Sequence, residues 1–170
     1  MSEQTRRIVG LDPGLRVTGW GVIEVSQGKL IHIANGAVKS NARLSLPERL
    51  LQLDEGLRSV LMQWQPREAS VENSFVNKDA VATLKLGQAR AISLLAPARF
   101  GISVAEYAPT AVKKTVTGVG HADKRQILAM ISMLLPKADI SNEHAADALA
   151  IAICHAYITQ NLMSRVKAVL

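Results

Sequence analysis

Four side chains in this sequence have the types and positions that metal-dependent chemistry needs. Asp12 directly follows the apolar run Ile8–Leu11, and Glu72 ends a second short segment in which polar and apolar residues alternate. His144 and Asp147 stand three residues apart, so they share one face of a helix. A carboxylate at the end of a buried strand is costly to desolvate unless a partner such as a divalent cation pairs with it.

Each of these positions also has an explanation that involves no metal. Asp12 can cap the turn before Pro13, as Asp often does. Glu143 and Asp147 can complement the positive end of the helix dipole, and His144 can cap the helix or donate a hydrogen bond. Taken one at a time, the positions leave both explanations open.

Alternating strands and helices must position these side chains. The expected strands are Ile8–Leu11, Val17–Val25, Leu30–Val38, Glu68–Glu72 and Gly101–Tyr107. The expected helices cover 45–65, 79–96, 110–117, 122–135 and 141–161. The second helix is expected to direct inward the residues Val81, Leu84, Ala91, Leu94 and Leu95. This order predicts one α/β domain with a mixed sheet, in which ligand sites gather beyond the strand ends.

The composition bounds the size and the partners of this domain. The chain has 170 residues, 48% of them hydrophobic, which is enough for one packed core and short for two. We expect a single domain over residues 1–160 and a flexible tail over 161–170. A formal net charge of +6 and a pI near 9.8 favour a polyanionic partner such as nucleic acid. The single cysteine, Cys154, fits a reducing cytoplasm, and no apolar run approaches the length of a signal peptide or a membrane span.

Taken together, the motifs of this chain are highly specific. They are Gly10–Gly14 with Thr18 and Gly19, Glu72 followed by Phe75, Leu84–Arg90, Val112 and Lys113 through Gly118–Gly120, and His144–Ala150. In this order they resemble the ribonuclease H-like nucleases and, within them, the RuvC family of Holliday junction resolvases. The resemblance covers nearly all of the chain to about His155.

The resemblance implies a ribonuclease H-like mixed five-stranded β-sheet flanked by helices. It implies a homodimeric endonuclease that resolves four-way DNA junctions by paired symmetric nicks during recombination and repair, in association with a branch-migration helicase. Asp12, Glu72 and Asp147 match the family's acidic metal ligands, and His144 stands where many members have Asp and others have His. Two Mg²⁺ ions, replaceable by Mn²⁺, would activate the attacking water and stabilise the leaving 3′ oxygen. His144 would be a ligand or a proton carrier.

The resemblance also assigns three residues to DNA binding. It implies that Phe75 stacks on an unpaired base, although Phe75 can instead fold back over the core. Lys113 and Lys124 match positions that contact the DNA backbone near the cut.

Three other classes of protein share parts of the pattern. Asp-x-Gly followed by Thr-Gly also resembles the phosphate-binding hairpin of actin-like sugar kinases, which need two such lobes where this chain has residues for one. A junction-binding protein without catalysis and a general ribonuclease of the same fold are the other two. A cleavage assay that offers a four-way junction, a linear duplex and an RNA–DNA hybrid distinguishes all of them.

Overall fold

The computed structural model describes residues 5–74 and 79–167. Its strands are β1 (Arg6–Asp12), β2 (Val17–Ser26), β3 (Lys29–Lys39), β4 (Glu68–Glu72) and β5 (Ser103–Tyr107). Its helices are α1 (Leu46–Trp64), α2 (Ala80–Arg99), α3 (Pro109–Thr117), α4 (Lys124–Leu134) and α5 (Glu143–Lys167). The expected elements are all present, although α5 runs six residues beyond the predicted end near Asn161.

The five strands form one mixed sheet in the order β3-β2-β1-β4-β5. β1, β2 and β3 form an antiparallel meander, while β4 and β5 run parallel to β1. The predicted mixed five-stranded sheet is therefore confirmed. β1 lies at its centre, and the carboxyl ends of β1, β4 and β5 meet at one edge.

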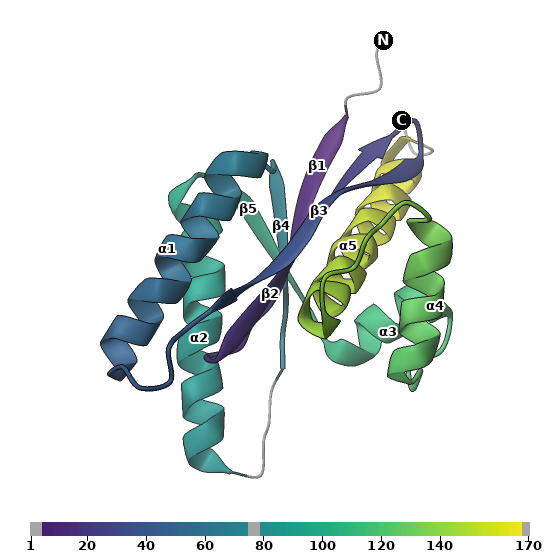
Figure 1. Cartoon of the computed structure of the whole chain (residues 1–170). Coiled ribbons are helices and arrows are strands. Elements are labelled where there is room, and N and C mark those ends of the chain that lie inside the picture. The colour runs from purple at the N-terminus through teal and green to yellow at the C-terminus, as the bar shows by residue number, and fades with distance from the viewer. Residues whose placement is uncertain (1–4, 75–78, 168–170) are drawn as a thin grey trace.

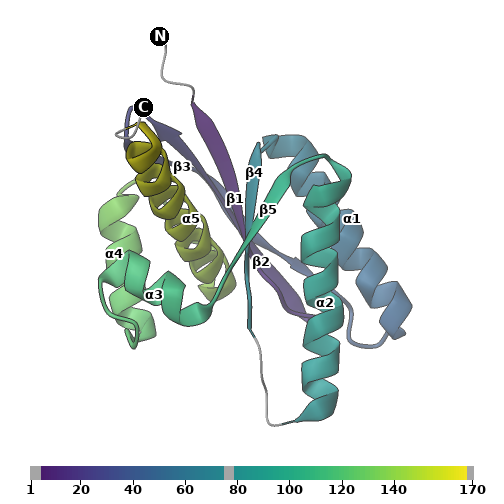
Figure 2. The same cartoon turned by 180° about the vertical axis from the view of Figure 1, so that it is seen from behind.

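Helices cover both faces of the sheet. α1 and α2 lie on one face (Figure 1), and α5, backed by α3 and α4, lies on the other, as the reverse view also shows (Figure 2). Side chains of β1 alternate between the two cores: Val9 and Leu11 pack beneath α1 and α2, whereas Ile8 packs beneath α5. The same alternation on β4 sends Ala69 and Val71 to the α1–α2 side. The residue that follows Leu11 on β1 and the residue that follows Val71 on β4 therefore face α5.

Glycines let α5 approach the sheet more closely than side chains would allow. A Cβ built on Gly10 would stand 2.6 Å from the backbone nitrogen of Ala152, and one on Gly19 would stand 2.9 Å from the Cβ of His144. The helix backbone thus rests almost directly on β1 and β2. Gly10 and Gly19 thereby set the distance between the sheet and the first half of α5.

The prediction for the face of α2 is wrong for four of its five residues, since only Leu94 packs against the core. Val81, Leu84 and Leu95 are 59%, 64% and 43% exposed, and the helix instead buries small residues, Ala89 and Ala96 among them. α1 packs against α2, and Leu57 and Leu61 of α1 share one buried cluster with Ala96. The small residues of α2 thus face the core, and the three exposed residues lie on its outer face. Within the described part of the chain, none of the helices has the length and apolar character to cross a membrane.

Candidate active site

Two carboxylates lie together because β1 and β4 are parallel neighbours. The register pairs Leu11 with Val71, so the following residues, Asp12 and Glu72, end the two strands at the same edge of the sheet. Both fall on the side that faces α5, by the alternation described above. The predicted juxtaposition of strand-end carboxylates is thus present in the structure.

The start of α5 brings the other two predicted residues to this edge. Asn142 caps the helix: its Oδ1 accepts a hydrogen bond of 2.9 Å from the backbone nitrogen of Ala145. His144, the second residue of the helix, places Nδ1 3.2 Å from Oδ2 of Asp12. Asp147 follows on the same face, with its side chain 35% exposed.

The three carboxyl groups influence one another's ionisation. Burial raises the pKa of Asp12 to about 6; the hydrogen bond with His144 opposes this rise, and the charges of Asp147 and Glu72 add to it. Burial raises the pKa of Glu72 as well, with a further contribution from Asp147. Burial is also the main cause of the raised pKa of Asp147. Groups that disfavour each other's charged forms favour the binding of a cation between them.

Two lysines share a cleft with two of these carboxylates, Glu72 and Asp147. Glu72, Lys113, Lys124 and Asp147 line a cavity of about 400 Å³ between the end of β4 and helices α3, α4 and α5. Lys124 Nζ lies 3.9 Å from Oδ2 of Asp147 and 3.0 Å from Oε2 of Glu143. Lys124 is the first residue of α4, where the helix dipole disfavours a cation. Its hydrogen bond with Glu143 and the charge of Asp147 raise its pKa and keep it protonated.

As they stand, the side chains do not form a metal-coordination shell. Across residues 5–74 and 79–167, no group of three or more His, Cys, Asp or Glu side chains is gathered closely enough to hold an ion. Each carboxylate instead has a local partner: Asp12 pairs with His144, Glu72 accepts a 2.8 Å hydrogen bond from Ser74, and Asp147 faces the lysine at the start of α4. Coordination of an ion would replace these contacts.

The donor atoms nevertheless fit a divalent cation. The three carboxylates supply hard oxygen ligands, which suit Mg²⁺, and their mutual repulsion is the condition that such an ion relieves. The Oδ1 of Asn73, next to Glu72, is buried and has no hydrogen-bond partner among the described residues. A polar oxygen left unpaired at this edge is a further atom that can interact with an ion or its water.

The structure brings six of the seven predicted site residues to this edge of the sheet; Phe75 lies outside the described residues. Asp12, Glu72, His144 and Asp147 surround the ends of β1, β4 and α5, and Lys113 and Lys124 face them from α3 and α4. Their chemical roles stay predictions. Sequence alone does not predict that Glu143 pairs with Lys124, because no periodic signal tells where α4 lies relative to α5.

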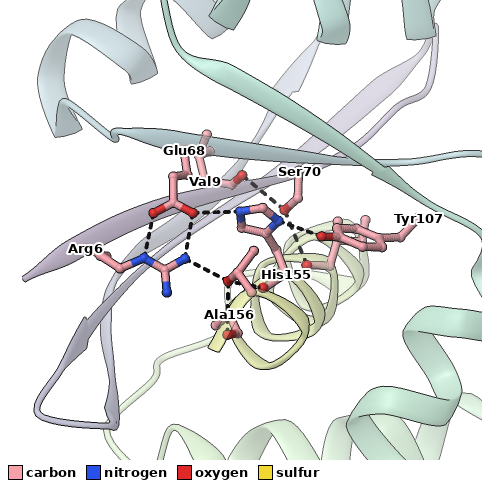
Figure 3. A network of polar contacts seen from close by, with 9 residues as sticks. Arg6, Val9, Glu68, Ser70, Tyr107, His155 and Ala156 are labelled. Atoms are coloured by element: carbon pink, nitrogen blue, oxygen red, sulfur yellow. Dashed lines mark hydrogen bonds and ion pairs between the residues drawn. The ribbon is translucent and has the colours of Figure 1, made fainter. Parts of the chain in front are cut away.

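A second polar cluster anchors α5 at its other half (Figure 3). Glu68 Oε2 lies 2.6 Å from Nη2 of Arg6 and 2.8 Å from Nε2 of His155, and His155 Nδ1 lies 2.7 Å from Oη of Tyr107. Although burial raises the pKa of Glu68, the hydrogen bonds with Arg6 and His155 lower it to about 2. Ser70 adds a 3.3 Å hydrogen bond to the carbonyl oxygen of Ile151. This cluster ties α5 to β1, β4 and β5.

Comparison with known proteins identifies the family. The family model of the crossover junction endodeoxyribonuclease RuvC matches residues 8–155. The chain is 61% identical to the crossover junction endodeoxyribonuclease RuvC of Bradyrhizobium diazoefficiens, over 96% of this chain and 93% of that protein. It is 58% identical to the RuvC of Brucella ovis, over 95% and 94%.

Solved structures agree with this result. RuvC of Thermus thermophilus in complex with a Holliday junction substrate superposes with a TM-score of 0.84 at 31% identity, over 91% of this chain and 94% of that one. The yeast mitochondrial Holliday junction resolvase Ydc2 shares the fold, with a TM-score of 0.65 at 12% identity over 97% and 86%. The predicted ribonuclease H-like fold is confirmed. The chain belongs to the RuvC family of crossover junction endodeoxyribonucleases, which are divalent-metal-dependent nucleases.

Proposed function

We propose that this chain resolves four-way DNA junctions by paired symmetric nicks during homologous recombination and DNA repair. The observation that carries the proposal is the convergence of Asp12, Glu72 and Asp147 on one edge of the sheet, beside a cleft that Lys113 and Lys124 also line. Carboxylates can hold ions at the scissile phosphate, and ammonium groups can bind the phosphates that flank it. The net charge of +6 favours a nucleic acid partner.

Asp12, Glu72, His144 and Asp147 would hold two Mg²⁺ ions, with Mn²⁺ able to replace them. Bound ions would lower the pKa of the attacking water and stabilise charge on the leaving 3′ oxygen. The water oxygen then forms a bond to phosphorus while the bond from phosphorus to the 3′ oxygen breaks, which leaves ends that a ligase can join. His144, which contacts Asp12 at 3.2 Å, would either complete the ligand set or accept the proton of the water.

The remaining contacts would fix the junction in the site. We assign Lys113 and Lys124 to backbone phosphates near the cut, and Phe75 to stacking on an unpaired base at the junction centre. Lys124 would exchange its contacts with Glu143 and Asp147 for a phosphate oxygen when DNA and ions bind.

Two nicks placed symmetrically in one junction require two active sites. A homodimer supplies them, and the exposed apolar residues of α2, Val81, Leu84 and Leu95, are the surface that we assign to the contact between subunits. The branch-migration helicase is the further partner that the family resemblance implies. Cys154 is a buried free thiol, which is compatible with work in the reducing cytoplasm.

The test compares substrates and active-site variants under one set of conditions. The wild-type protein should nick a four-way junction in Mg²⁺ or Mn²⁺ and leave a linear duplex and an RNA–DNA hybrid intact. Asp12→Asn, Glu72→Gln and Asp147→Asn should each lower nicking by orders of magnitude, because an anionic ligand is lost while the shape is kept. Band shifts should show that all three still bind the junction, since phosphate contacts elsewhere dominate affinity.

Two results would contradict the proposal. Unchanged nicking by all three variants would remove these carboxylates from the site. Preferential cutting of the RNA–DNA hybrid would instead favour a general ribonuclease of the same fold.

A further inference from the structure

The side chain of Asn35, on the edge strand β3, holds the loop before α5 to the sheet. Its Oδ1 accepts two hydrogen bonds from Ser141, one from the backbone nitrogen at 3.0 Å and one from Oγ at 2.9 Å. Its Nδ2 donates to the carbonyl oxygen of Asp139 at 2.7 Å and contacts Nε2 of His32 at 2.9 Å. Asn35 therefore ties two residues of this loop to β3, across more than 100 positions of sequence.

The hydrogen bonds continue from this loop into the first turn of α5. Ser141 Oγ accepts a 3.0 Å hydrogen bond from Nδ2 of Asn142, and Asn142 Oδ1 caps the backbone nitrogen of Ala145 at 2.9 Å. The carbonyl oxygen of Asn142 then accepts the first helical hydrogen bond, from the nitrogen of Ala146 at 3.1 Å. An unbroken chain of polar contacts thus links the amide of Asn35 to the N-cap of the helix.

This series of hydrogen bonds holds the start of α5 in place, and the start of α5 carries two of the site residues. His144 and Asp147 belong to the first turns, and Nδ1 of His144 lies 3.2 Å from Oδ2 of Asp12. The absence of a side chain at Gly19 lets the backbone of His144 lie close to the sheet. The cluster around Glu68 anchors α5 near His155, and the contacts made by Asn35 hold the residues just before the N-cap.

We propose that Asn35 is a positioning residue for the active site: it fixes the first turn of α5, and through it His144 and Asp147, against β1. The proposal rests on the function proposed above, in which these two residues hold the ions. Asn35 acts through Ser141 and Asn142 and needs no contact with DNA. Its loss should therefore loosen the helix start without removing any ligand.

The experiment uses the full chain and two readouts that need no DNA. In Asn35→Ala, hydrogen exchange of the Ala145 and Ala146 amides should become roughly tenfold faster, the effect of losing about one net hydrogen bond. Mn²⁺ affinity, measured by titration calorimetry, should fall in the same variant. The matched control is Asn41→Ala: Asn41 also receives a backbone hydrogen bond, from Arg43 at 3.0 Å, but lies in the loop before α1. It should change neither readout.

Two further variants keep the test decisive. Ser141→Ala removes only the hydroxyl and leaves the backbone hydrogen bond to Asn35, so exchange should accelerate less than in Asn35→Ala. Asn35→Asp retains an acceptor for both Ser141 donors and should restore part of the protection and of the Mn²⁺ affinity.

Exchange rates and Mn²⁺ affinity that match the wild type in Asn35→Ala would overturn the proposal, as would equal losses in Asn41→Ala. Failure of the wild-type chain to nick junctions, with the exchange effects present, would refute the proposed function and leave the placement of α5 by Asn35 standing.

Discussion

Replacement of Gly10 by Ala should separate α5 from the sheet and thereby disable the site. The added Cβ would stand 2.6 Å from the backbone nitrogen and 3.0 Å from the Cβ of Ala152, and would overlap the carbonyl oxygen of Ala148. These are mostly backbone atoms, so no side-chain rotation can relieve the contact. The helix would have to retreat by more than about 1 Å to reach ordinary contact distance, against a close-packed core on both sides.

The expected cost lies at the upper end of the range for overpacking. We expect Gly10→Ala to lower the free energy of unfolding by about 3 kcal/mol, because the obstructing atoms belong to a helix that the cluster around Glu68 also anchors. A displacement of about 1 Å at Asp147 should slow nicking by roughly 100-fold in the protein that remains folded. Urea denaturation and single-turnover nicking of a four-way junction measure the two effects.

The matched control is Gly87→Ala in the middle of α2. A Cβ at Gly87 would meet nothing within 4 Å, so the substitution should raise stability by about 0.5–1 kcal/mol through helix propensity alone. Gly10→Ala with the stability and the nicking rate of the wild type would show that α5 does not rest on this strand as described.

Four further predictions concern single side chains. Because the pKa of Glu68 is about 2 in the folded chain against an ordinary 4.5, its stabilisation is complete above about pH 4.5 and is lost as the pH falls toward 2. Allowing for partial exposure, wild type should lose about 1–2 kcal/mol more than Glu68→Gln between pH 7 and pH 2 in urea titrations; parallel curves would contradict this. His144→Asp should keep nicking activity and narrow the preference for Mn²⁺ over Mg²⁺, whereas His144→Ala should nick far more slowly. Equal nicking rates in both metals for the wild type and these two variants would remove His144 from the site. Lys124→Ala should reduce the salt dependence of junction binding by roughly one released counterion, which a binding series in KCl would reveal. Phe75→Ala should slow junction nicking at an unchanged Tm, and mismatches at the junction centre should restore part of the rate; a large fall in Tm would place Phe75 in the core.

The parts of the site that lie at element ends were predictable from sequence, because strand and helix periodicities locate those ends. Asp12 closes an apolar strand, Glu72 closes one with alternating polar and apolar residues, and the capping signal at Asn142 locates the first turn of α5. The pairing of the strands themselves needed the structure, or the family resemblance, since no local pattern shows that β1 neighbours β4.

Other features could not be predicted because they depend on long-range packing. Hydrophobicity alone assigned Val81 and Leu84 to the core, yet α2 buries Ala89 and Ala96 and leaves these two exposed. The role of Asn35 depends on a loop more than 100 residues away, and its neighbourhood in sequence reads as an ordinary strand. Polar contacts of this kind leave no periodic signal.

The chain order of the active site has a consequence for protein synthesis. Asp12 lies on the first strand and Glu72 on the fourth, but Asp147 belongs to the last helix, which also covers the face of β1 and β2. A nascent polypeptide that has left the ribosome only as far as β5 therefore holds two of the three carboxylates on an uncovered sheet. Translation must pass α5 before that face is buried and the third carboxylate arrives. Under the proposed function, a nuclease built in this order completes its set of carboxylates only after α5 has been synthesised.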